Sequence, residues 1–184
     1  MVTTVSPAGP ALVPAAGGTG YALKHPELPD TLSAVTNADL GVKLLELGIN
    51  GADARPVLGT EKTVSIVGAN SNAIPGVSMG AWLIPSQKRL IVAAGGEKTT
   101  VSGRLKIDLG KLGLMPANNG ESIIYSSLET DQVLLQTTGV NRGKLLGLKR
   151  GQKDAEGRFT LAPADVVDVT VPAGACTFVM VSTQ

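Results

Sequence analysis

The residues that could do chemistry in this chain of 184 residues are few and stand apart. His25 is the only histidine and Cys176 the only cysteine, which excludes histidine pairs, zinc-protease motifs and an internal disulfide. His25 lies between Lys24 and Pro26, a setting that favours a satisfied or solvated loop histidine over a general base. Cys176 falls in an alternating apolar stretch, which predicts a buried, inert thiol.

Four acidic residues could in principle supply the paired carboxylates of glycoside hydrolysis: Asp108, Glu121, Glu129 and Asp131. Their spacing in a chain of short strands does not show that any two converge, so we interpret them as surface acids. The glycine-rich stretch at 17–20 has neither the preceding strand nor the following lysine of a phosphate loop. The sequence therefore predicts a protein that is not an enzyme and uses no metal or cofactor.

The densest run of charge is basic and lies in the stretch GVNRGKLLGLKRGQK. It contains Arg142, Lys144, Lys149, Arg150 and Lys153 before any acid. A basic hairpin of this kind could meet an acidic partner or a phosphate backbone. Leucines interleave with the charges, and the stretch has no aromatic residue for base stacking, so we favour the alternative of a solvated strand edge protected by lysines.

The elements that must position these residues are strands. Residues 82–109, WLIPSQKRLIVAAGGEKTTVSGRLKIDL, predict three strands of one antiparallel meander. The last third alternates apolar with polar residues, which is the period of a half-buried strand. Turns are predicted at residues 85–88, where Pro85 cannot donate to the ladder, and at residues 95–98, where two glycines precede polar residues.

Short apolar runs separated by turn residues continue through the rest of the chain. They lie at residues 63–67, 122–125, 132–136, 144–148, 158–161, 167–171 and 176–182. The pattern predicts an all-β fold, an antiparallel β-sandwich or jelly roll. We expect its buried side chains to include Leu90, Val92, Leu105, Ile107, Val169, Val171, Phe178 and Met180.

One stretch, residues 30–47, fits two interpretations. Its leucines recur at helical spacing before Gly48, which is a good helix stop. Gly41 and Val42 weaken a helix, and the alternation over residues 42–44 fits a strand equally well. The balance favours a strand over residues 41–49.

Residues 1–30 are rich in proline and glycine and hold hardly a charge before Lys24. We interpret them as an extended arm, followed by a β-sandwich domain over residues 31–184. Disordered tails are usually charged, whereas this segment offers apolar side chains that could lie in a neighbour's groove. These side chains are Val2, Val5, Leu12, Val13 and Tyr21. A flexible linker is the alternative.

Composition limits the partners. Charged residues make up 17% of the chain, against roughly 25% in soluble domains, which indicates either a surface covered by another chain or one rich in Thr and Ser. The net charge of +1 gives no field that would steer the protein to nucleic acid or to an anionic membrane. The N-terminus lacks a signal peptide's basic region, and no run approaches the ~18 apolar residues that span a bilayer. We expect a soluble protein.

From Trp82 onward, the order of features resembles the all-β accessory domains that follow the catalytic domain of many glycoside hydrolases. The resemblance is carried by residues 89–93, by residues 106–114, and by residues 168–174 leading into 178–181. It implies a carbohydrate-binding or accessory module whose ligand is a polysaccharide.

The whole chain also resembles, in type, the decoration or cement proteins of tailed-phage heads. The shared features are a β-sandwich that stands alone, a Pro/Gly-rich N-terminal arm, low charge, few aromatic residues and no active site. This resemblance implies a structural protein of a virion, whose partners are copies of itself and another structural protein such as a capsid lattice. We favour it over the accessory module because the chain starts at its own Met1 with no fused enzyme.

Overall fold

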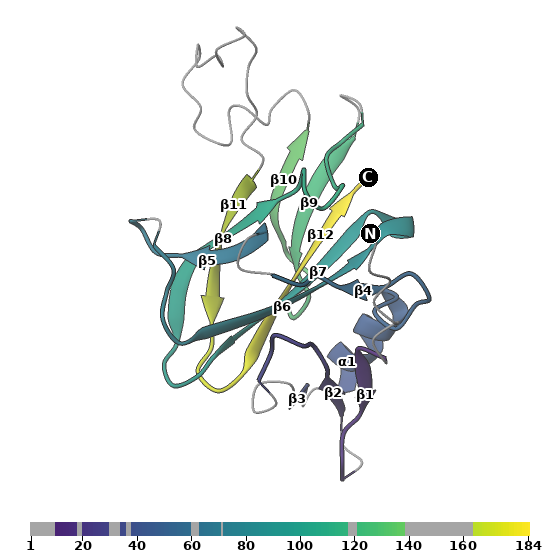
Figure 1. The fold of residues 1–184 in the computed structure, drawn as a ribbon, viewed down its shortest axis with the longest axis vertical. Helices are drawn as coiled ribbons and strands as arrows, with labels where there is room; N and C mark the ends of the chain where they lie inside the picture. Colours follow the sequence, from purple (N-terminus) through teal and green to yellow (C-terminus); the bar gives the residue numbers. More distant parts are fainter. Residues whose placement is uncertain are drawn as a thin grey trace, which may run out of the picture.

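The computed structural model describes residues 10–17, 20–29, 34–35, 38–59, 63–70, 72–117, 121–138 and 164–184. They form two antiparallel sheets packed face to face, with a smaller layer outside one of them (Figure 1). The predicted all-β sandwich is confirmed, while a jelly-roll connectivity stays a prediction. The one described α-helix, α1, is too short to cross a membrane.

The larger sheet has six strands in the order β10-β9-β12-β7-β6-β4. Their bounds are β4 (Arg55–Pro56), β6 (Val77–Ile84), β7 (Arg89–Gly96), β9 (Ser122–Ser127), β10 (Val133–Thr138) and β12 (Cys176–Thr183). The smaller sheet has the order β11-β8-β5, with β5 (Val64–Val67), β8 (Val101–Asp108) and β11 (Ala164–Val171). The outer layer contains the hairpin of β1 (Leu12–Pro14) and β2 (Tyr21–Leu23), then β3 (Ala34–Val35) and α1 (Ala38–Glu46).

The main core lies between the two sheets. Alternate residues of β8 and β11 point inward, so Leu105 and Ile107 pack among Val167, Val169 and Val171. Of the side chains expected to be buried, seven are buried and Met180 is partly buried. Leu114 is also buried, and Leu112 and Met115 pack against this core from the loop after β8. Six of the eight expected residues belong to this core, whereas Phe178 and Met180 lie on the opposite face of β12, whose Val179 and Val181 point into the core.

The six-stranded sheet buries its second face as well. In β6 and β7, Leu83 and Val92 point into the main core, whereas Trp82 and Ile91 point to the opposite face. A second cluster forms there with residues from the outer layer: Ala11, Leu12, Leu23, Leu28, Leu40, Leu44 and Ile49. The apolar run at residues 90–94 is continuous because both faces of its strand are covered.

The predicted three-strand meander is wrong at its second turn. β6 and β7 do pair across the turn formed by the 3-10 helix Pro85–Gln87, but β8 pairs with β5 and β11 in the other sheet. Gly96 belongs to β7, where a Cβ atom would lie 2.8 Å from the carbonyl oxygen of Pro172. Gly96 therefore permits a close backbone approach, and the chain crosses between the sheets immediately after it.

The strand favoured over residues 41–49 is wrong, because this stretch contains α1. Leu40 and Leu44, four residues apart, lie on one helix face in the second cluster. Gly41 is tolerated because the ring of Tyr21 occupies the space that a side chain would need. The packing of this face outweighs the weak helix propensity of Gly41.

The predicted extended arm differs from the structure over residues 10–29, which we call the N-terminal cover. The cover folds back on its own chain, and Leu12, Leu23 and Leu28 are buried in the second cluster (Figure 1, beside α1). Its apolar side chains find a surface within the same domain, because the outer face of β6 and β7 is itself apolar. Residues 1–9 and the two expected strands at 144–148 and 158–161 lie outside the described residues.

Candidate functional site

His25 joins the N-terminal cover to the sheet. Its side chain is 6% exposed, and its ring meets the Trp82 ring edge-on, with the centroids 4.8 Å apart. Strand β4 ends at Pro56, and just beyond it the backbone N–H of Val57 donates to the carbonyl oxygen of Ala81 on β6 at 2.8 Å. His25 contacts the same residue, because its Nε2 lies 3.0 Å from the carbonyl oxygen and 3.3 Å from the backbone nitrogen of Ala81.

The hydrogen bonds of His25 define its tautomer. The backbone N–H of Glu27 donates to Nδ1 at 3.1 Å, whereas the backbone N–H of Ala81 lies 3.3 Å from Nε2, beside the Ala81 carbonyl oxygen at 3.0 Å. The two shorter contacts are satisfied together when Nδ1 is the acceptor and the proton of the neutral ring is on Nε2. Nε2–H then donates to the carbonyl oxygen of Ala81. Burial is the largest influence on the ring, and it lowers the pKa of His25 below its ordinary 6.5, although the Ala81 bond and the Glu27 carboxylate act in the opposite direction.

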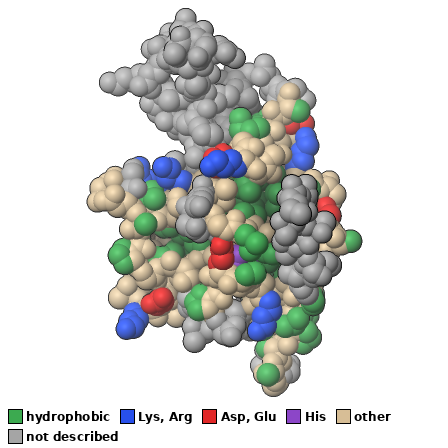
Figure 2. Space-filling view, in the orientation of Figure 1, with side chains coloured by type: hydrophobic (Ala, Val, Ile, Leu, Met, Phe, Trp, Pro, Cys, Tyr) green, Lys and Arg blue, Asp and Glu red, His purple; other side chains and the backbone are tan. Residues whose placement is uncertain are grey.

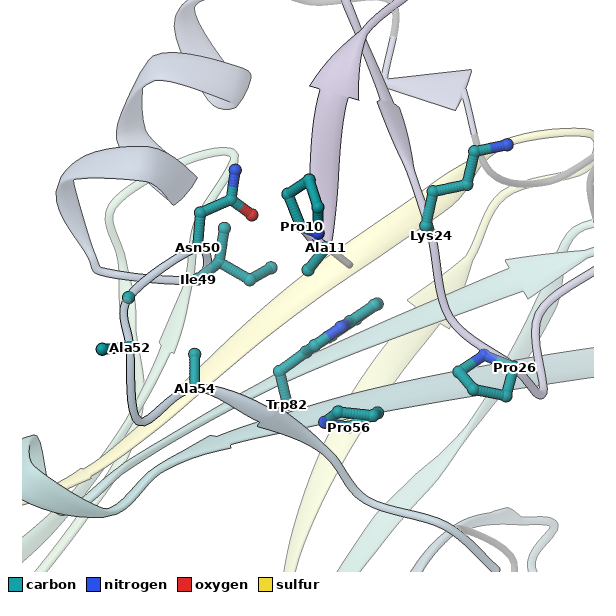
Figure 3. Close-up of a pocket in the computed structure, with 11 residues that line it drawn as sticks. Pro10, Ala11, Lys24, Pro26, Ile49, Asn50, Ala52, Ala54, Pro56 and Trp82 are labelled. Carbon is teal, nitrogen blue, oxygen red and sulfur yellow. The ribbon is translucent and has the colours of Figure 1, made fainter. Parts of the chain in front are cut away.

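Beside this joint lies a pocket of about 360 Å³ between the cover and the sheet. Figure 3 shows Trp82 with Pro10 and Ala11 on one side and Pro26 and Pro56 on the other. The Lys24 side chain extends away from the pocket in this view. The walls of the pocket are mainly apolar. The Asn50 side chain, which also lines the pocket, is hydrogen-bonded to the backbone of Leu12: its Oδ1 accepts from the N–H at 2.9 Å and its Nδ2 donates to the C=O at 2.7 Å.

Cys176 is not an activated thiol. It lies at the start of β12, partly buried, and burial together with the nearby Glu129 carboxylate raises its pKa to about 11. At neutral pH the side chain is therefore a thiol and a weak nucleophile. This agrees with the inert role predicted for it from the sequence.

The four candidate acids each have a structural partner. Asp108 accepts from the backbone N–H of Lys111, Glu121 pairs with Lys88, Glu129 accepts from the backbone N–H of Phe178, and Asp131 pairs with Lys43. The Ala117 backbone N–H also donates to Glu121, and these contacts lower the pKa of Glu121. The described residues contain no group of three potential metal ligands.

Of the predicted partner-binding residues, the structure describes Leu12, Val13 and Tyr21, and it places all three in the β1–β2 hairpin. Leu12 is buried inside the domain, and Val13 and Tyr21 are partly buried in the same hairpin. Val2 and Val5 lie outside the described residues, as do Arg142, Lys144, Lys149 and Arg150. The apolar side chains of the cover therefore serve its attachment to the sheet.

An exposed apolar pair that sequence reasoning missed begins β10. Val133 is 58% exposed and Leu134 is 39% exposed, and among the described strands theirs forms the outer edge of the six-stranded sheet. The stretch was predicted as a strand, but its position at the edge follows only from the pairing with β9. The sequence of the strand, VLLQTT, contains neither a charge nor a proline, and this was the evidence from which an exposed apolar pair could have been predicted.

Charge is dispersed over the described surface that Figure 2 shows. On the face shown in Figure 2, acidic and basic side chains lie scattered and near one another, without a large patch of one sign. A shallow hollow of about 540 Å³ on the three-stranded sheet is lined by Arg104 and Asp168 among smaller side chains. The Arg104 guanidinium there is bound to the carbonyl oxygens of Gly68 and Ala69.

Comparisons with known proteins give no family for this chain. It matches no protein-family model, no curated protein and no solved structure.

Proposed function

We propose that the protein is a non-enzymatic structural subunit of a multi-subunit assembly and that the edge strand β10 is one of its contact surfaces. The observation that carries the proposal is the exposed pair Val133 and Leu134 on this edge. A sheet edge offers backbone donors and acceptors to an added strand, and exposed apolar residues beside it add buried area.

The two ends of the six-stranded sheet support this choice. At one end, β4 has only two residues, Arg55 and Pro56, a short edge with a charge and a proline. At the other end, β10 has six residues with neither a charge nor a proline. Proteins commonly protect free edges by the devices seen in β4, so the unprotected β10 is the edge suited to a partner strand.

Carbohydrate binding by an accessory module is the alternative, and the aromatic residues weigh against it. Sugar-binding surfaces present exposed flat rings, but Trp82, Tyr125 and Phe178 are buried. Tyr21 is partly buried and packs against Gly41. In the described part of the chain, no aromatic ring is left as an exposed stacking platform. Protein contacts therefore fit this surface better.

The finer proposal is a decoration or cement protein of a tailed-phage head, with the virion as its location and a capsid lattice as its partner. It rests on the likeness of type described above: a β-sandwich, low charge and no catalytic arrangement. Co-sedimentation of the purified protein with preformed capsid shells tests this finer proposal separately from self-assembly.

The general proposal is tested by the mass of the protein in solution. Val133→Lys places a charge on the β10 edge and should reduce the assembled fraction measured by light scattering after size-exclusion chromatography. Val42→Lys is the matched control, because Val42 is 45% exposed but lies on α1.

Removal of residues 1–9 tests the remaining part of the predicted arm. A protein that stays monomeric at high concentration and binds no protein partner would contradict the proposal.

A further inference from the structure

The attachment of the N-terminal cover depends on polar contacts at identifiable places. Hydrogen bonds hold the cover to the rest of the domain where Leu12 meets Asn50, where His25 meets Ala81, and where the Glu27 carboxylate accepts from the backbone N–H of Gly59 at 2.6 Å. The amide of Asn50 does not titrate. His25 is the group among these whose charge changes in the range just below neutral pH.

Protonation of His25 conflicts with its surroundings in two ways. An imidazolium has N–H donors on both nitrogens, so a protonated Nδ1 would face the backbone N–H of Glu27, two donors 3.1 Å apart. The ring would also carry a positive charge at a site that is 6% exposed. Both conflicts disappear when the cover leaves the sheet and the ring enters water.

The groups around the ring offer little compensation. On β6, Gly80, Ala81 and Trp82 contain no titratable side chain, and neither does Val57. The backbone groups of Ala81 and Val57 favour the imidazolium, but their effect on the pKa of His25 is smaller than that of burial. The Glu27 carboxylate is the charged group that favours the imidazolium, but one of its oxygens already binds Gly59. Burial outweighs it, so the pKa of the attached ring is lowered.

We propose that His25 makes the cover acid-sensitive: protonation of its imidazole raises the population of a state in which residues 10–29 are detached from Trp82. The detached state exposes the apolar floor of the pocket, which Trp82 and Ile49 help to form. This inference is independent of the proposed role in an assembly.

The sign of the pH dependence follows from linkage. The detached ring protonates at its ordinary pKa of 6.5, and the attached ring at a lower pKa. Attachment is therefore strongest above pH 6.5 and weakens as the pH falls toward the pKa of the attached ring. Between the two values, the equilibrium constant for detachment rises as the pH falls, by at most about tenfold for each pH unit.

Amide hydrogen exchange in the native protein measures this equilibrium. After correction for intrinsic rates, protection of the Leu12 and Glu27 amides should fall as the pH decreases below 6.5, by at most about tenfold for each pH unit, and level off below the pKa of the attached ring. The Val92 amide, in the central strand β7, is the internal control and should keep its higher protection. If all three amides exchange together at every pH, the cover does not detach separately and the proposal is wrong.

Two variants separate the histidine from the rest of the attachment. His25→Gln cannot titrate, so the pH dependence of Leu12 and Glu27 exchange should disappear. Asn50→Ala removes the contact with the Leu12 backbone, which does not depend on pH. It should therefore lower the protection of both amides at every pH, while the change of protection with pH stays as in the wild type. A slope unchanged in His25→Gln would overturn the proposal.

Because His25 is the only histidine, its ring signal in the wild-type NMR spectrum gives an assay that does not depend on how the variants fold. The proposal expects protonation below pH 6.5, coincident with loss of Leu12 and Glu27 protection. Protonation at or above pH 6.5 with both amides still protected would refute it.

Discussion

The two faces of the six-stranded sheet are covered in different ways. One face packs against β5, β8 and β11, whose alternating apolar residues interdigitate with those of β6, β7 and β12. The other face is covered by α1 and the short strands β1 and β2, with a buried histidine among the apolar side chains. One face of the sheet is thus covered by a continuous apolar core, whereas the layer on the other face is also held by hydrogen bonds at a few places.

This difference separates the core of the fold from the part that can move. The contacts between β8 and β11 extend along eight paired residues, so they open only when the sheet unfolds. The N-terminal cover contributes two strands of three residues each and is held by hydrogen bonds at a few places. Small changes to its contacts should therefore release it without unfolding the sandwich.

The largest expected effect comes from the main core. Ile107→Ala empties a fully buried site between the two sheets and should lower the free energy of unfolding by about 2–5 kcal/mol. Urea denaturation followed by circular dichroism measures this change. Exchange of the Val92 amide should increase, because the substitution weakens global folding, whereas exchange of the Leu12 amide should change little, because the cover detaches without global unfolding. A loss confined to Leu12 would contradict the assignment of this core.

An intermediate effect is expected where the cover touches the sheet most closely. A Cβ atom on Gly80 would lie 2.8 Å from both the His25 ring and the Leu28 side chain, so Gly80→Ala should cost about 1–3 kcal/mol. The damage should appear first as faster exchange at Leu12. Gly110→Ala is the control, since its Cβ would have an ordinary 3.5 Å contact with Asp108. Equal protection of Leu12 in both variants would contradict the close packing of the cover.

The smallest effect is expected at the ion pair that ties α1 to the turn before β10. Lys43 Nζ lies 2.7 Å from Asp131, whose side chain is mostly exposed, so Asp131→Asn should cost only about 0.2–1 kcal/mol. Asparagine also accepts the positive φ of this position. Thermal unfolding at low and high salt provides the measurement, and the difference should shrink at high salt. A larger, salt-independent loss would mean that the outer layer depends on this contact.

The main core was predictable because its signal is local. Leu105 and Ile107 alternate with polar residues, and Val169 and Val171 do the same, so each strand reveals its buried face without reference to its partner. The turn at Pro85–Gln87 was likewise predictable from the proline. The sequence did not show which strands pair with one another. The meander was therefore assigned to one sheet, although β8 belongs to the other.

The second face was not predicted because its signal is distributed. Leu12, Leu23 and Leu44 belong to three separate elements that lie far apart in the chain. The continuous apolar run at residues 90–94 was the available evidence that a second layer existed. It did not identify the segment that forms this layer. For the same reason, the proline-rich start of the chain was interpreted as an arm.

The sequence by itself determined that this protein is built from short antiparallel strands, because side-chain alternation and turn residues act within a few positions of each other. It also determined that one histidine and one cysteine are available for chemistry. Only the tertiary structure decided that His25 is buried against Trp82 and that β10 is an exposed edge. Both depend on contacts between residues far apart in the chain, and the free energy of such contacts cannot be inferred from a local sequence pattern.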